Sequence, residues 1–308
     1  MTRSRMAIAV GALALLASAL VTISGASATA DPPAESASAD SSLQGVPKGL
    51  PGGGKKVFGR DRFLFAYYGF AHPSTTFVLG ETNPDRAFAK MRRQGRKLLR
   101  DGENLLPVYE LVVTVADAEP GTDGDYAHDT LHSKVQEYVD AAERNGALLL
   151  LDLQPGRASF LEAAKRWEWA LVHPWVGLAL DTEWRMSSTQ VPGRDIGDVT
   201  AKELNRVAAW ASDLVKAQRL PEKLVVLHQH RPGNVKGISK VRDHDGVAWV
   251  QHVDAAGSPA SKIATYRNVA RPRQFVTGFM VFLESDAPVM KPRAIRGIDD
   301  AIRFVSHQ

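Results

Sequence analysis

Short apolar runs alternate with segments of helical periodicity along most of the chain. The runs that predict strands cover residues 63–70, 105–115, 147–154, 176–184, 223–230, 247–253 and 275–284. The segments that predict helices cover residues 84–100, 131–144, 158–172, 201–218, 259–268 and 295–305. Regular alternation of this kind favours parallel strands joined by crossover helices, and the unbroken leucines at 148–151 are typical of a sheet covered on both faces.

The size and the alternation predict an α/β fold, a TIM-like barrel of parallel strands. Since only seven strands are convincing, the barrel is either a complete (β/α)8, with residues 76–79 or the stretch near Val57 as the eighth strand, or an incomplete (β/α)7. An open, doubly wound sheet is the competing fold. Two features disfavour it: no glycine-rich phosphate fingerprint follows the first strand, and polar residues end nearly all the strands rather than those at one switch point.

The strand at 176–184 has the clearest pattern of all. If its alternation continues to the end, Gly177, Ala179, Asp181 and Glu183 share one face. Small residues followed by two acids suit the crowded interior of a barrel whose chemistry lies at the C-terminal ends of its strands. Two neighbouring carboxyl groups also shift each other's pKa, which can leave one protonated as a general acid and the other ionised.

The first 56 residues differ in composition from the rest. Residues 1–30 carry Arg3 and Arg5, then an apolar run and small residues that end at Ala30, the order of a secretory signal peptide. Residues 31–56 are rich in Ala, Ser, Pro and Gly and predict a disordered linker. The single barrel domain is expected to span 57–308. We therefore predict a secreted protein, extracellular or associated with the cell wall, with no membrane span after cleavage.

The cysteine content and the net charge exclude or disfavour several classes of function. The chain has no cysteine, so disulfides cannot stabilise it and thiolate zinc sites are excluded. Removal of the first 30 residues leaves 36 basic against 34 acidic residues, a balance that does not predict nucleic-acid binding. The sequence also lacks the phosphate-binding Gly-Lys-Ser/Thr loop and the Gly-x-Ser-x-Gly nucleophile elbow, which disfavours nucleotide-binding and serine-hydrolase functions.

Polar and aromatic side chains follow several of the predicted strands. If the barrel forms, they meet at one mouth, where substrate-binding residues are expected to join Asp181 and Glu183. The predicted substrate-binding residues are Tyr67, Tyr68, Glu110, Asp152, Gln154, Trp184, His228, His230 and Glu284. Trp249 and Phe282 could also stack on sugar faces, although packing is the better explanation for Trp249.

The Asp181-x-Glu183 pair resembles the end of the Asp-x-x-Asp-x-Asp-x-Glu signature of family 18 chitinases and related endoglycosidases. Ala179 stands where that family has another acid. The resemblance implies that Glu183 donates a proton to the leaving oxygen and that Asp181 assists it. It indicates the wider glycoside-hydrolase type of barrel, acting on a polysaccharide or cell-wall glycan, more than that one family.

Two alternatives use the same residues. One is a non-catalytic barrel that binds carbohydrate or cell wall. The other is a metal-dependent hydrolase in which His228 and His230, on one strand face, hold a divalent ion with Asp152, Asp181 or Glu110. The main prediction is carboxylate acid/base catalysis by a monomer without a metal or other cofactor.

Overall fold

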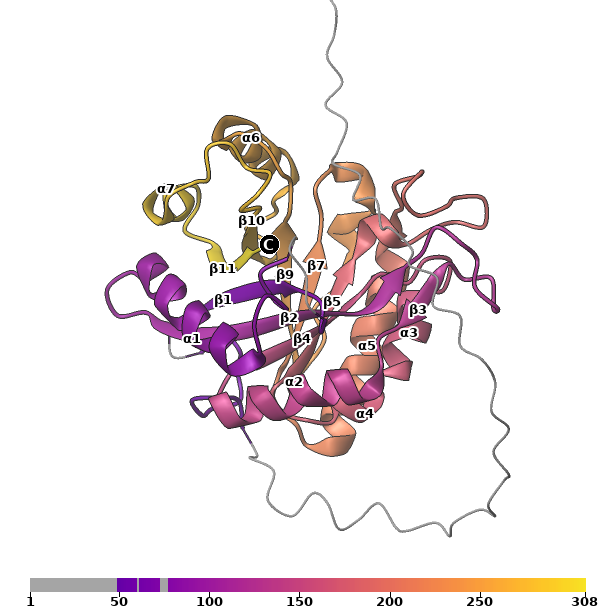
Figure 1. The fold of residues 1–308 in the computed structure, drawn as a ribbon, viewed down its shortest axis with the longest axis horizontal. Coiled ribbons are helices and arrows are strands. Elements are labelled where there is room, and N and C mark those ends of the chain that lie inside the picture. The colour runs from indigo at the N-terminus through magenta and orange to yellow at the C-terminus, as the bar shows by residue number, and fades with distance from the viewer. Residues whose placement is uncertain (1–48, 60, 73–76) are drawn as a thin grey trace, which may run out of the picture. The chain divides into compact units, whose positions relative to one another are not determined.

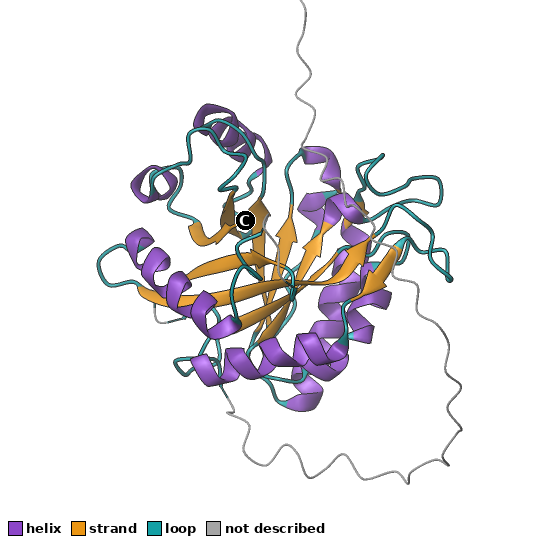
Figure 2. Ribbon diagram, viewed as in Figure 1, coloured by secondary structure: helices purple, strands orange, loops and turns teal. Residues whose placement is uncertain are grey.

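The computed structural model describes residues 49–59, 61–72 and 77–308. Eight parallel strands close into a barrel in the order β1, β11, β10, β9, β7, β5, β4 and β2, and β2 pairs with β1 to complete the circle. This closure confirms the predicted TIM-like barrel and excludes the open sheet. The strands lie at the centre of Figure 2 and the helices lie around them.

The first half of the barrel follows the predicted pattern closely (Figure 1). It contains β1 (Arg62–Gly69), α1 (Pro84–Gly95), β2 (Asn104–Ala116), α2 (His132–Asn145), β4 (Leu148–Leu153), α3 (Phe160–Arg166), α4 (Glu168–Leu171) and β5 (Val176–Asp181). A short 3-10 turn, η1 (Arg96–Leu98), extends α1, and β3 (Ala127–Asp129) pairs antiparallel with the end of β2. The chain between 158 and 172 forms two helices rather than one, and they meet at Trp167.

The second half contains, in chain order, α5 (Ala201–Gln218), β7 (Lys223–His228), β9 (Val247–Val253), α6 (Pro259–Val269), β10 (Val276–Val281), α7 (Pro292–Arg296) and β11 (Ile302–His307). Between β7 and β9 the chain has only the 3-10 turns η3 (Pro232–Asn234) and η4 (Ile238–Lys240) and the two-residue strand β8 (Val235–Lys236). The short strand β6 (Val199–Thr200), which pairs with β8, directly precedes α5.

Two helix ends have the local chemistry that the sequence indicated. Thr200 caps the start of α5, because its side chain accepts a hydrogen bond from the backbone N–H of Glu203. Gly146 ends α2 with φ 64°, a left-handed conformation that glycine adopts without steric cost.

The eighth strand is β11, and both sequence-based candidates for it were wrong. Leu79 forms only an isolated bridge to Gly69, and Val57 lies in a turn. The predicted helix at 295–305 was also wrong, because a short helix ends at Arg296 and the chain then becomes β11 between β1 and β10. Gly297 disfavours a longer helix, and Phe304 pairs in register with Leu64 to close the barrel.

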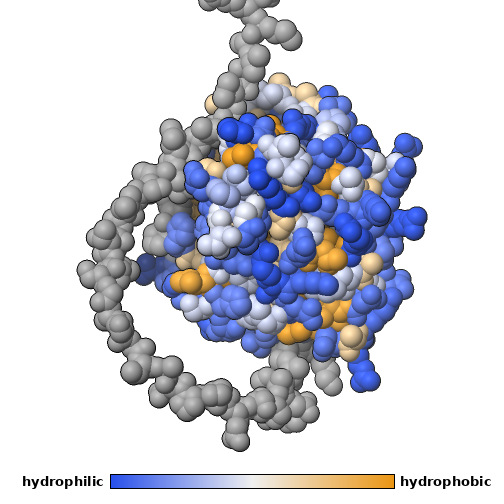
Figure 3. Space-filling view, turned by 90° about the vertical axis from the view of Figure 1, so that its right-hand side faces the viewer, coloured by the Kyte–Doolittle hydropathy of each residue, from blue (hydrophilic) through white to orange (hydrophobic). Residues whose placement is uncertain are grey.

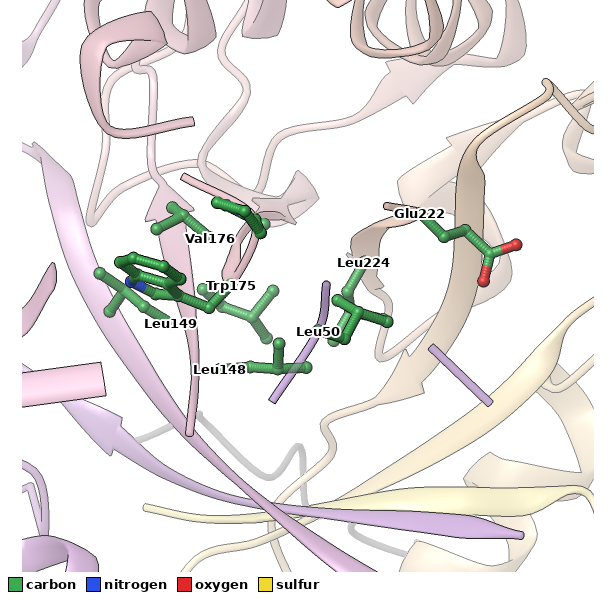
Figure 4. A pocket seen from close by; sticks show the side chains of 10 residues that line it. Leu50, Leu148, Leu149, Trp175, Val176, Glu222 and Leu224 are labelled. Carbon is green, nitrogen blue, oxygen red and sulfur yellow. The ribbon is translucent and has the colours of Figure 1, made fainter. Parts of the chain in front are cut away.

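The N-terminal end of the barrel is closed by the chain that precedes β1. Leu50 is buried and lies with Leu148, Trp175 and Leu224 around a small, mainly apolar pocket (Figure 4). The folded unit therefore includes residues 49–56, which the sequence assigned to the linker. The predicted signal peptide and the rest of the predicted linker lie outside the described residues.

One face of the molecule is mainly hydrophilic. On the side that carries α3 and α5, Figure 3 shows hydrophilic residues over most of the face, with small hydrophobic groups between them. Within the described ranges, no helix has both the length and the apolar character needed to cross a bilayer.

Candidate active site

Four polar side chains from four adjacent strands meet inside the barrel, three of them at or next to the last residue of a strand and Glu110 midway along the long strand β2, level with Tyr68 near the end of β1. Glu110 comes from β2, Asp152 from β4, Asp181 from β5 and His228 from β7. Their exposed fractions are 0%, 0%, 5% and 2%. Strand alternation places Leu150 on the same face as Asp152 and Gly177 on the same face as Asp181, and a Cβ added to Gly177 would meet the Leu150 side chain.

His228 is the centre of this cluster. Its Nε2 lies 3.0 Å from Glu110 Oε1 and 3.6 Å from Asp152 Oδ2. Its Nδ1 lies 3.2 Å from Oδ2 of Asp254, the residue that follows β9. The Thr182 hydroxyl donates a 2.7 Å hydrogen bond to the His228 carbonyl, which holds the end of β7 against β5. The imidazole thus joins acids from three parts of the chain.

Gln154 and Tyr68 cover the cluster. Gln154 Oε1 accepts a hydrogen bond from the Ala116 backbone N–H, and its Nε2 donates to the Tyr68 hydroxyl at 3.3 Å and to Asp181 Oδ2 at 3.5 Å. Both side chains are buried. They connect the ends of β1, β2, β4 and β5 above the acids.

Glu183 lies beside the cluster and not on the strand. The strand β5 ends at Asp181, and the chain turns into the 3-10 helix η2 (Thr182–Trp184). The predicted strand at 176–184 is therefore too long, and alternation does not set the direction of Glu183, although Glu183 still lies close enough to Asp181 to raise the pKa of that residue. Glu183 is the more open of the two acids: its side chain is 35% exposed, and its Oε2 lies 3.6 Å from His230 Nδ1.

The two predicted histidines likewise separate. Since β7 ends at His228, alternation does not extend to His230, whose ring meets Glu183 while His228 meets Glu110. The prediction that both imidazoles share one strand face was wrong. Among the described residues, the group able to offer a metal ion three ligand atoms is Glu110, Asp152 and His228, whose ligand atoms all lie within 4.8 Å of one another.

Burial perturbs the charges of these groups. It raises the pKa of Asp152 to about 8, with repulsion from Glu110 adding to the effect and His228 opposing it. Burial, followed by repulsion from Asp152 and Glu183, raises the pKa of Asp181 well above its usual range. Burial and repulsion from Asp254 raise the pKa of Glu183, which His230 partly offsets.

The two buried histidines differ in charge. Burial by itself lowers the pKa of His228, but hydrogen bonds to Asp254 and Glu110 outweigh it and raise that pKa well above 6.5. Burial, together with the charge of His228, lowers the pKa of His252. The His252 Nε2 lies 2.7 Å from the Ser306 hydroxyl. We infer an imidazolium at His228 and a neutral ring at His252.

Several buried carboxylate oxygens in the cluster have no hydrogen-bond partner. They are Glu110 Oε2, both oxygens of Asp152, Asp181 Oδ1 and Asp254 Oδ1. Buried polar atoms in folded proteins are nearly always paired, so such a group points to a function rather than to stability.

An apolar group lies at the same end of the barrel, and we call it the mouth cluster. It is separate from the main core. It consists of Tyr68, Val112 and Met280, with Phe70, Phe77, Val115 and Phe282 partly buried against them. The predicted aromatic residue Phe282 thus lies at the mouth.

The remaining predicted residues lie elsewhere or at the edge. Tyr67 faces away from the barrel interior, with its ring against Phe65 and His307. Trp249 donates to the Arg242 carbonyl from the N-terminal half of β9. Glu284 is exposed in the turn after β10, and Trp184 is half-buried at the end of η2.

Sequence reasoning missed Asp254 and Ser306. Asp254 directly follows the strand predicted at 247–253, so the rule that selected the other acids could have found it. Ser306 was hidden because its segment was read as a helix.

No family model and no curated protein matches this chain. Among solved structures, the mannohexaose complex of Thermomonospora fusca beta-mannanase is similar, with 14% sequence identity and a TM-score of 0.40 over 79% of this chain and 77% of that chain. At this identity and TM-score the likeness carries no argument about this chain and assigns no residue a role. The resemblance of Asp181 and Glu183 to family 18 stays a prediction.

Proposed function

We propose that this protein is a glycoside hydrolase-like enzyme that uses carboxyl groups as acid and base, with Glu183 as the proton donor. One observation carries the proposal. Glu183 combines a pKa raised above its ordinary value with a side chain that is 35% exposed, so it keeps its proton to a higher pH than an ordinary glutamate and can still reach a bound molecule. Asp152 and Glu110 are fully buried and lack that access.

The buried residues then serve as support. Asp181 is the partner of Glu183: its negative charge, when present, stabilises positive charge that develops on the substrate, and its raised pKa makes this charge dependent on pH. Gln154 orients Asp181 through the amide contact at 3.5 Å. His228 balances the charge of Glu110 and Asp254 below them.

The mouth cluster supports a carbohydrate as the ligand. A sugar ring presents apolar C–H faces and polar edges, and aromatic side chains next to carboxyl groups match both. Phe70, Phe77 and Phe282 are partly buried at the same end of the barrel as Glu183. We propose a polysaccharide or cell-wall glycan as the substrate class.

Export accompanies this proposal. The order of charged, apolar and small residues in 1–30 is that of a secretory signal, and a glycan substrate outside the cell would require export. Mass spectrometry of the protein from culture medium would give the mature N-terminus. A chain that retains Met1, or that stays in the cytoplasm, would contradict export.

The test of activity is a screen of defined oligosaccharides, with mass spectrometry of the products. On any substrate found, Glu183→Gln should lower kcat by at least about 100-fold and leave substrate binding intact, because a general acid accelerates the chemical step by about 10²–10⁴-fold. Glu143→Gln, an exposed change on α2, is the matched control and should retain full activity. Full activity of Glu183→Gln would refute the assignment, and binding without cleavage of any glycan would favour a non-catalytic carbohydrate-binding barrel.

A further inference from the structure

We propose that Glu110, Asp152 and His228 form a binding site for a divalent transition-metal ion such as Zn²⁺ or Mn²⁺. Glu110 comes from the middle of β2, Asp152 from the neighbouring strand β4, and His228 from the end of β7, which β5 separates from β4. One carboxylate oxygen from each acid and one ring nitrogen, all within 4.8 Å of one another, make a mixed N/O ligand set. Imidazole and carboxylate together suit zinc and manganese, and the absence of cysteine excludes thiolate sites.

The spacing fits an ion between these atoms. Ligands about 2.1 Å from a metal ion and at tetrahedral or octahedral angles to each other lie about 3.0–3.4 Å apart. His228 Nε2 is 3.0 Å from Glu110 Oε1 and 3.6 Å from Asp152 Oδ2. The Glu110 and Asp152 oxygens lie within 4.8 Å of each other, so side-chain movement that draws the two acids together would bring all three atoms to bonding distance.

The unpaired oxygens are the independent observation that points to a ligand. Asp152 is fully buried, yet neither of its oxygens has a hydrogen-bond partner, and Glu110 Oε2 is also unpaired. Buried charges in proteins are paired or coordinate metals. A cation at this position would pair oxygens that no donor in the described chain reaches.

The surroundings of His228 are those of a metal-ligating histidine. A metal ion would displace the Nε2 proton of the imidazolium: Nδ1 would then donate to Asp254 Oδ2 at 3.2 Å, and the freed Nε2 lone pair would face Glu110 and Asp152. A carboxylate on the far nitrogen is the usual second partner of such a ligand, since it fixes the tautomer and raises the basicity of the ring. His230 is not part of the site, because its ring meets Glu183.

The direct test is metal binding by the full mature chain after treatment with EDTA and dialysis. Isothermal titration with Zn²⁺ and with Mn²⁺, and metal analysis after gel filtration, should give one ion per chain. Co²⁺ should give visible absorption bands that report nitrogen and oxygen ligands. No substrate is needed, so the result does not depend on the proposed hydrolase activity.

Variants locate the site. Asp152→Asn, His228→Gln and Glu110→Gln should each weaken metal binding at least about 30-fold. Glu110→Gln takes the place of either of the other two variants if that variant fails to fold. His230→Gln is the matched control and should bind as the wild type does. If the wild type binds no metal at 1 mM, its Kd lies above about 1 mM and the proposal is overturned. Unchanged binding by the folded ligand variants, or a loss confined to His230→Gln, would overturn it too.

Discussion

Replacement of Asp181 by Asn should stabilise the metal-free protein at neutral pH. Asp181 is 5% exposed, its Oδ1 has no partner, and its one hydrogen bond, from Gln154, is long at 3.5 Å. Burial and the neighbouring acids raise its pKa, so the folded state must either bind a proton or hold an unfavourable charge. Asn has nearly the same shape and keeps an oxygen that can accept the hydrogen bond from Gln154, but it carries no charge and needs no added proton.

The sign of the pH effect follows from linkage. When a carboxyl group has a raised pKa in the folded state, the folded protein becomes less stable as the pH rises from the unfolded pKa, near 4, towards the folded pKa. The advantage of Asp181→Asn should therefore grow as the pH rises above about 4, by no more than about 1.4 kcal/mol per pH unit, until the pH passes the raised pKa of the folded state. We expect a gain of about 1–3 kcal/mol at pH 8, the range for relief of a buried unsatisfied group.

Urea unfolding at pH 5 and pH 8 in EDTA would measure this difference. Asp213→Asn, at an exposed position on α5, is the matched control and should change the free energy of unfolding by less than about 0.5 kcal/mol. If Asp181→Asn instead lowered the stability at pH 8 by 1 kcal/mol or more, the carboxylate would have a favourable partner in the folded state. The argument for strain at this site would then fail.

Three further predictions concern other parts of the barrel. On any substrate found, kcat/KM should fall as the pH rises through the raised pKa of Glu183, since the donor must be protonated; a rate that only increases with pH would contradict its role as the acid. Burial lowers the pKa of Lys223 to about 7, so between about pH 7 and 10 the unfolded chain binds more protons than the folded protein does. The free energy of unfolding of the wild type should therefore rise over this range, by at most about 1.4 kcal/mol per pH unit. Urea unfolding of Lys223→Met should show that the rise is lost. Gly278→Ala should lower stability by about 1–3 kcal/mol, because the new Cβ would stand 2.2 Å from His252 Nδ1, while Gly233→Ala, with nothing within 4 Å, should change the melting temperature little.

The sequence by itself determined the class of fold and the end of the barrel where the polar groups gather. Apolar runs and helical periodicity are local properties, and they located β9 at 247–253 and α5 at 201–218 as the structure has them. The rule that side chains at the C-terminal ends of parallel strands converge was enough to select Glu110, Asp152, Asp181 and His228, which the structure brings together.

Tertiary structure decided which of these side chains meet and where the barrel closes. His228 and Glu110 are 118 residues apart, and only strand order and register bring them within 3.0 Å. Alternation predicts a facing direction only while a strand lasts, so it gives none for Glu183 and His230, which both lie just past a strand end. The segment at 302–307 contains the strand-forming residues Ile302, Phe304 and Val305, but the sequence reasoning had extended a helix over it. It becomes a strand because β1 and β10 otherwise expose unpaired edges that the eighth strand joins.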